Sequence, residues 1–395
     1  DQMSVVDDRA EWIAVTRKGS LGVGILAVAL CALSAYFNRQ QFFRSYLFAY
    51  VFWAGIPVGC LGVVMIQHLV GGTWGFVIQR LLESAIRTLP VIALLFLPLF
   101  LGMPAIYSWA RPDGVAQGAI LQHQSIYLNV PSFALRTVLY FAIWITLGTL
   151  LTKWSEEQDR RVDPLLTQRL KALSGPGLVL YGLTVTFSTI DWVMSLEPRW
   201  YSTIYGMIFM VSDGLVALAF VIAASYFLWN RKPLAQVAQP WVLQDLGNML
   251  LAFVMLWAYT SFSQFLLIWV ENLQKEIPWY VYRLANGWGA VAIALTAMQF
   301  AVPFLLLLSR ANKRRAETLC AIALLIVVMH QLELFWFVAP TFHPTGLSVH
   351  GLDVLTPIAI GGLWLSAFLG QLRGRSLVPL HDPRFVEVVE EIKEG

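Results

Sequence analysis

Two acidic residues and one histidine lie inside long apolar segments of this chain, where an ionisable side chain is costly unless it has a partner or a task. Asp213 occurs in MVSDGLVAL, and no basic residue shares that apolar segment. His330 and Glu333 occur three residues apart in HQLELFWF, so a helix would place them on one face. A carboxyl group and an imidazole at such positions can pass a proton along. Each can equally form a structural pair with another helix, and both interpretations stay open.

A second group of charged residues lies in IDWVMSLEPRWYSTIYG, residues 190–206, where one apolar segment ends and the next begins. This short hinge contains Asp191 and Glu197. Arg136 lies at the start of an earlier apolar segment, on the same predicted side of the membrane. Because opposite charges at a membrane boundary tend to pair, we expect Arg136 to form a structural clamp with Asp191 or Glu197.

Polar groups also mark the opposite ends of two segments. Asp245 and Asn248 stand three residues apart at the start of segment 243–270, and His68 lies near the end of segment 45–70. Asp245, Asp213 and His68 could form the inner half of a proton route, with Asp191, Glu197, His330 and Glu333 as its outer half. Polar side chains also join helices in membranes, and His68 is typical of an interfacial residue.

The sequence argues against redox groups and metals bound by this chain. Its three cysteines, Cys31, Cys60 and Cys320, are far apart and form no CxxC or CxxCH motif, which argues against iron–sulfur clusters and covalent haem. Only His68 and His330 lie within apolar segments, near opposite faces of the membrane, so they could not bind one haem together. No metal site and no catalytic residue is predicted, and the net charge of +3 does not indicate nucleic-acid binding.

The elements that must position these residues are transmembrane helices. The 395 residues are 58% hydrophobic and 13% charged, against roughly 25% charged in soluble domains. Runs of about 20 apolar residues, the length of a membrane-spanning helix, recur along the chain. We predict an all-α integral membrane protein with ten transmembrane helices at residues 19–37, 45–70, 88–110, 131–152, 174–196, 203–229, 243–270, 285–308, 317–338 and 354–371.

The distribution of basic residues sets the orientation. Most of the 27 Lys and Arg residues fall in the N-terminal segment, the even-numbered loops and the C-terminal tail. Both termini are therefore predicted to be cytoplasmic. The chain divides into a cytoplasmic segment at 1–18, a membrane domain at 19–371 and a cytoplasmic tail at 372–395, whose end, FVEVVEEIKE, is typical of an amphipathic helix.

Some stretches are less regular. Residues 74–87 pair apolar with charged positions, which fits a helix on the membrane surface or a tilted, overlong third span. Pro90, Pro98 and Pro104 predict bends in that span. The charged residues of 153–173 are typical of a solvated loop. Tryptophans near span ends, such as Trp200 and Trp279, are typical of an aromatic belt at the membrane interface.

Several long motifs resemble one family of membrane subunits. They are DWVMSLEPRWYSTIYG from Asp191, DLGNMLLAFVMLWAYTSFSQFLLIWVENLQKEIPWYVYR from Asp245, YLNVPSFALRTVLYFAIW at 127–144, QLELFWFVAP at 331–340 and PLHDPRF at 379–385. Together they resemble the second polysulfide-reductase-like (NrfD-type) membrane subunit of bacterial alternative complex III, a subunit family called ActF. The likeness covers roughly residues 45–385.

The resemblance implies both a fold and a function. The family fold has two four-helix bundles, here spans 2–5 and 6–9, with two flanking helices. The complex is a respiratory or photosynthetic quinol:cytochrome c oxidoreductase, or one serving another periplasmic acceptor, in the bacterial plasma (inner) membrane. The resemblance further implies these partners: a sister NrfD-type subunit, an iron–sulfur protein, multihaem and monohaem cytochrome c subunits, small membrane subunits and lipids.

The redox work would then belong to those partners, which hold the haem and iron–sulfur clusters. Quinol oxidation is assigned in the family to the sister subunit, while menaquinone binding and proton translocation are possible roles of this one. The chain departs from its relatives at Glu333-Leu334-Phe335, where they tend to carry Asp-Leu-Tyr. The carboxylate is kept and a phenol is lost, so no role is inferred for that hydroxyl.

Two other functions remain open at this point. The chain could be a purely structural membrane anchor of the complex, with every polar group serving a contact between helices. It could also be a stand-alone ten-span secondary transporter. Such transporters carry broken helices at matching positions of two halves, and Pro57 in the second span has no obvious counterpart in the sixth.

Overall fold

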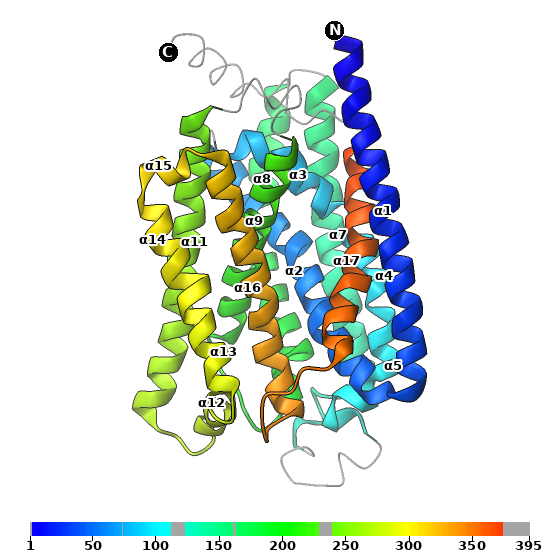
Figure 1. Ribbon diagram of the computed structural model, residues 1–395, viewed down its shortest axis with the longest axis vertical. Helices are drawn as coiled ribbons and strands as arrows, with labels where there is room; N and C mark the ends of the chain where they lie inside the picture. The colour runs from blue at the N-terminus through cyan, green and yellow to red at the C-terminus, as the bar shows by residue number, and fades with distance from the viewer. Residues whose placement is uncertain (1, 73, 112–122, 161–162, 229–238, 374–395) are drawn as a thin grey trace.

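The structure, a computed structural model, describes residues 2–72, 74–111, 123–160, 163–228 and 239–373, with side chains from residue 11 onward. The described residues form helices and connecting turns (Figure 1). The prediction of an all-α protein built from long apolar helices is confirmed. The predicted tail helix and the PLHDPRF motif fall in 374–395 and lie outside the described residues.

Nine of the described helical segments are long and apolar enough to cross a membrane, and one bent pair would make a tenth. The nine are α1 (Gln2–Phe37), α2 (Arg39–Val70), α7 (Val130–Arg160), α8 (Pro164–Trp192), α9 (Tyr205–Leu228), α11 (Pro240–Glu271), the α13–α14 segment (Trp288–Leu308), α16 (Ala316–Phe342) and α17 (Gly351–Leu372). Within Trp288–Leu308, a π-helical segment η4 (Thr296–Ala301) separates α13 (Trp288–Leu295) from α14 (Val302–Leu308). Short elements include α12 (Ile277–Leu284), α15 (Arg310–Lys313) and the 3-10 turns η1 (Ser108–Ala110) and η3 (Met194–Leu196).

The bent pair consists of α3 (Trp74–Ile86) and α4 (Leu89–Leu95), followed by α5 (Leu97–Ile106) at an angle of 52°. The bend falls between Leu95 and Leu97, next to Pro98 at the start of α5. Proline lacks the N–H that would bond to the preceding turn, and its ring clashes with that turn's carbonyl. The predicted bend in the third span therefore has a direct cause.

Of the two alternatives for residues 74–87, the surface helix is wrong, and an overlong third span fits the bent pair that begins at Trp74. All residues of α3 are buried inside the protein, and α3 packs against α2, α9 and α17. The amphipathic pattern arose because the charged side chains of α3 pair with those of α7, as described below. An intramolecular ion-pair cluster and a solvated helix face look alike in sequence.

Helices α2 and α9 form the centre of the molecule (Figure 1). Within the most apolar stretch of each helix, 94% of the residues of α2 and 72% of those of α9 are buried. Helix α2 packs against α3, α5 and α8, and α9 packs against α11 and α16. Helices α1 and α17 pack along each other at one side, with α17 also against α2. The first residues of α1 and the last of α17 lie at the same end of the molecule (Figure 1).

Two other sequence interpretations need correction. Residues 153–160 continue α7 rather than forming a solvated loop, and Glu156 and Asp159 are in ion pairs. Among the tryptophans, Trp200 and Trp279 are 5% and 2% exposed and stack with ring centroids 4.8 Å apart. They pack inside the protein instead of lining its outer surface. Stacking and burial in a core stabilise an aromatic ring as well as a position at the membrane interface does.

Candidate functional site

Glu333 is the centre of a buried polar cluster formed by four helical segments. It lies on α16, is 1% exposed, and its two oxygens accept from every side chain of the cluster. The contacts are Trp257 Nε1 at 2.6 Å, His330 Nδ1 at 2.8 Å, Gln299 Nε2 at 2.9 Å and the Ser212 hydroxyl at 3.2 Å. A carboxylate with this many donors is satisfied without water, which makes its burial tolerable.

The π-helical segment η4 positions one of these donors. Gln299 lies within Thr296–Ala301 and is fully buried, with its amide directed at Glu333. A π-helical turn inserts one extra residue into a helix and rotates the side chains that follow, and such turns are frequent at functional sites. The apolar run 285–308 contains no sequence signal for this turn.

Asp213 lies directly beside this cluster. It follows Ser212 on α9, is 6% exposed, and interacts electrostatically with His330 and Glu333. Sequence position had divided these groups between an inner and an outer half of a route. The structure instead brings all three to one level, because α9 and α16 run antiparallel and pack side by side.

The Asp213 carboxyl group faces a small cavity. Its Oδ1 has no hydrogen-bond partner among the described residues. The cavity has a volume of about 20 Å³ and is lined by Asp213, Ser188, Thr189, Trp144, Trp192 and apolar side chains. That volume suffices for about one water molecule. Gly55 on α2 leaves the space for the carboxyl group, since a Cβ there would lie 2.4 Å from Asp213 Oδ1.

Asp191 lies at the end of α8 in a separate, fully bonded cluster. Arg136 holds it with two hydrogen bonds of 2.8 Å each, and the Tyr140 hydroxyl donates a third at 2.6 Å. The Arg136 guanidinium also stacks 3.8 Å above the Tyr127 ring. The expected clamp therefore forms with Asp191. A bidentate Arg–carboxylate pair with a fully buried acid positions helices well, so Asp191 joins α7 to α8.

Glu197 does not pair with Arg136. Its Oε1 accepts from Arg283 at 2.9 Å and from the Thr341 hydroxyl at 2.7 Å. Arg283, on α12, is 1% exposed and also donates to the Phe337 carbonyl. Arg283 was not predicted from the sequence, although its position inside the motif EIPWYVYR, among aromatic residues, was a signal that it would be buried.

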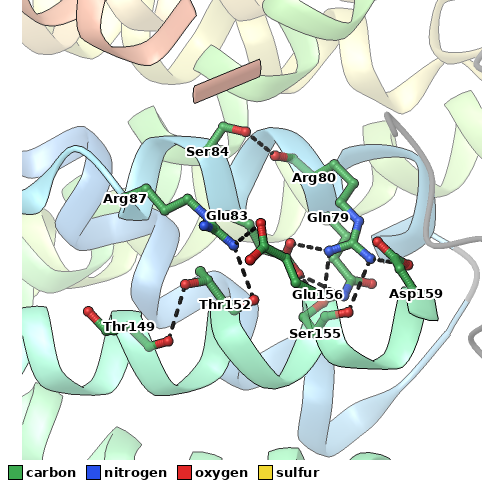
Figure 2. Close-up of polar contacts among 10 residues, drawn as sticks. All are labelled: Gln79, Arg80, Glu83, Ser84, Arg87, Thr149, Thr152, Ser155, Glu156 and Asp159. Atoms are coloured by element: carbon green, nitrogen blue, oxygen red, sulfur yellow. Dashed lines mark hydrogen bonds and ion pairs between the residues drawn. The ribbon is translucent and has the colours of Figure 1, made fainter. Parts of the chain in front are cut away.

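A second missed cluster joins α3 to α7 (Figure 2). Arg80 and Glu83 are 5% and 3% exposed and pair with each other. Arg80 also reaches Asp159 at 2.6 Å, and Ser155 donates to Glu83 at 2.6 Å. Their spacing of three residues, which places both on one helix face, was the available signal.

Figure 2 shows that the cluster continues one turn along α7. Arg87 forms an ion pair with Glu156 at 2.8 Å and donates to the Thr152 carbonyl. Together these contacts attach the whole polar side of α3 to the end of α7. They account for Arg80, Glu83 and Arg87 of residues 74–87 and for Glu156 and Asp159 of α7.

The other predicted inner residues are placed apart from these clusters. His68 is 2% exposed, with Nδ1 3.2 Å from the Ser174 hydroxyl, so its side chain is buried between α2 and α8. Asp245 lies in the second turn of α11 and is partly buried. Its neighbour Asn248 accepts from Lys313 at 2.6 Å.

The arrangement can hold and transfer protons. His330, Glu333 and Asp213 are three titratable groups in mutual interaction, and His330 Nε2 and Asp213 Oδ1 still have bonding capacity within the described part of the chain. No group of three or more His, Cys, Asp or Glu residues within it could hold a metal ion. The chain matches no protein-family model and no curated protein.

Proposed function

We propose that this chain is a membrane subunit of a bacterial quinol:acceptor oxidoreductase of the alternative complex III type, and that it conducts protons through the Asp213–His330–Glu333 cluster. Both termini lie in the cytoplasm, and the haem and iron–sulfur centres belong to partner subunits. The resemblance of the hinge at 190–206 and of the run from Asp245 supports membership in that complex.

The observation that supports the proton role is the set of groups that surround Asp213. A buried carboxyl group with an unpartnered oxygen contributes nothing to helix packing through that atom and is destabilising by about 1–3 kcal/mol. Here it lies next to an acid–imidazole pair and a cavity that can hold a water molecule. Proton transfer between such groups needs hydrogen bonds or one bridging water. The His330–Glu333 hydrogen bond is one such link, and the cavity beside Asp213 has room for one water molecule.

The helix contacts agree with an NrfD-type architecture. Helices α2, α4, α7 and α8 pack in one group and α9, α11, α14 and α16 in another, with α1 and α17 beside them, while α2 and α8 also pack against α9 across the two groups. Quinol chemistry is left to the sister subunit. The two cavities described here measure about 20 and 140 Å³, whereas small-molecule sites usually measure roughly 300–1,000 Å³. We therefore assign no quinone step to this chain.

A purely structural anchor is the second candidate, and the ion pairs favour it. Asp191 and Glu83 have their bonding capacity filled by fixed partners, as expected for groups that only join helices. We therefore assign Asp191 and Glu83 structural roles and restrict the proton role to the Asp213–His330–Glu333 cluster.

Proton uptake by membranes during quinol oxidation tests the proposal. Asp213→Asn and Glu333→Gln keep the size of each side chain and remove the proton-carrying acid. The expected result is at least a tenfold loss of proton uptake per electron, with the complex assembled and its haem content unchanged. Glu271→Gln, an exposed acid at the end of α11, is the matched control. Full uptake in both variants would leave the anchor as the function.

A change outside the acids gives an independent test. Gly55→Ala introduces a methyl group 2.4 Å from Asp213 Oδ1 and must displace the carboxyl group. Gly175→Ala on α8 meets nothing within 4 Å and serves as the control. We expect Gly55→Ala to reduce proton uptake as Asp213→Asn does, and Gly175→Ala to leave it unchanged.

A further inference from the structure

A second cavity, of about 140 Å³, lies beside the hinge between α8 and α9. Its lining comes from two stretches: Gln124, Tyr127 and Leu128 precede α7, and Ile190, Met194, Ser195, Pro198, Trp200 and Tyr201 belong to the hinge. Tyr201 is 58% exposed, so one wall reaches the surface. The wall at Ser195 is 5% exposed and lies inside the protein.

Three buried polar atoms in the walls of this cavity, on Trp200, Gln124 and the Tyr127 hydroxyl, have no hydrogen-bond partner in the described part of the chain. Trp200 is 5% exposed, and its Nε1–H donates to no acceptor among the described residues. Gln124 donates through Nε2 to the Pro198 carbonyl at 2.7 Å, while its Oε1, also buried, accepts nothing there. An unpartnered donor, an unpartnered acceptor and an unpartnered hydroxyl group around a cavity of this size are what bound water satisfies.

The inner wall of the cavity, formed by Ser195 and Tyr127, contacts the Asp191 clamp. The Ser195 hydroxyl donates to the Asp191 carbonyl. Arg136, which holds the Asp191 carboxylate, stacks on Tyr127 and donates to its carbonyl at 3.1 Å. On the other side of the same α8 turn, Thr189 and Trp192 line the small cavity of Asp213. The two cavities thus flank one helical turn.

We propose that the 140 Å³ cavity is an aqueous vestibule, and that it forms the outer mouth of the proton route from Asp213. The second part rests on the proposed function; the vestibule itself does not. The sequence had placed Glu197 on that outer path, but Glu197 is held by Arg283 and Thr341. The vestibule is the opening that leads toward the α8 turn at 189–192.

Substituted-cysteine labelling tests the vestibule. Ser195→Cys places a thiol in the inner wall, where a small, cationic, membrane-impermeant methanethiosulfonate can reach it only through water. The three native cysteines are buried. Thr260→Cys is the matched control, because Thr260 is also buried at 1%, also bonds to the helical carbonyl four residues earlier, and lies in the half of α11 nearer the predicted outer side. Met194→Cys, in the same cavity, serves if Ser195→Cys does not assemble.

In right-side-out vesicles carrying the whole complex, we expect Ser195→Cys to be labelled at least tenfold faster than Thr260→Cys. Labelling should also slow proton release. Equal, slow labelling of both thiols overturns the vestibule, as does labelling only by an uncharged reagent, which would indicate an apolar ligand site.

If Ser195→Cys is labelled fast but proton release is unchanged, the vestibule is not the outer mouth of the proton route, provided that Glu333→Gln still lowers proton uptake. If Glu333→Gln has no effect either, the proposed function fails, while the labelling still establishes the vestibule. The two failures are therefore distinguishable.

Discussion

Glu333 shows how a single acid can be stable in an apolar interior. Donors from α11, η4 and α9, together with His330 on its own helix, surround its oxygens. Each of these donors is buried, so each would lose its partner if the acid were removed. An unsatisfied buried donor is destabilising by about 1–3 kcal/mol, and the energetic role of Glu333 is therefore larger than that of any one contact.

We accordingly expect Glu333→Ala to destabilise the protein by several times the effect of Glu333→Gln. The Gln side chain keeps one acceptor oxygen for Trp257 or Gln299, whereas Ala leaves no acceptor. Thermal unfolding in mild detergent, followed by loss of the monodisperse peak in gel filtration, measures the difference. Equal midpoints for the two variants would mean that the donors find other acceptors.

At the scale of elements, α3 is an amphipathic helix whose charges are neutralised by another helix. Arg80 and Glu83 pair on α3, and Ser155 and Asp159 complete the cluster from α7 (Figure 2). Breaking a buried pair is destabilising by about 3–5 kcal/mol because the remaining charge is uncompensated, whereas replacing both members by apolar residues is often neutral. This asymmetry makes the cluster testable.

The prediction is that Arg80→Met lowers stability by about 3–5 kcal/mol and that adding Glu83→Met restores most of it. Asp159 then remains, but its side chain is 27% exposed and can be solvated. Thermal midpoints of the wild type, both single variants and the double variant form the required cycle. Additive losses in the double variant would show that the pair does not act as a unit.

At the scale of the whole molecule, α1 and α17 pack through glycines. A Cβ on Gly24 would lie 2.8 Å from the Leu363 backbone nitrogen, and one on Gly362 would lie 2.6 Å from Gly24 Cα. Small residues let helices approach closely, and dispersion contacts then hold them together in a lipid environment. Cys31 is 4% exposed and is buried in this contact with Leu352 and Ala359.

A bulky residue at that contact should separate the two helices. We expect Gly362→Leu to expose Cys31 and raise its rate of alkylation by a membrane-permeable maleimide at least tenfold. Gly22→Leu, whose site has nothing within 4 Å, should leave the rate unchanged. Mass spectrometry of the Cys31 peptide measures it. An unreactive Cys31 in Gly362→Leu would show that α1 is held elsewhere.

The apolar runs alone were enough to predict the long helices and to single out their polar residues. A backbone in hydrocarbon must satisfy its own hydrogen bonds, so a run of about 20 apolar residues has few alternatives to a helix. An acid in such a run stands out for the same reason, as Asp213 and Glu333 did.

The sequence alone could not predict which of the polar residues pair with one another. Asp191 pairs with Arg136, and Glu197 pairs with Arg283. The cluster around Arg80 buries charged residues whose pattern resembled a solvated helix face. These choices depend on which helices touch and how each is rotated. Helix faces toward lipid and helix faces toward protein are equally apolar, so the composition does not distinguish them. Only the packing of the helices, such as that of α2, α9 and α16, decides which residues meet.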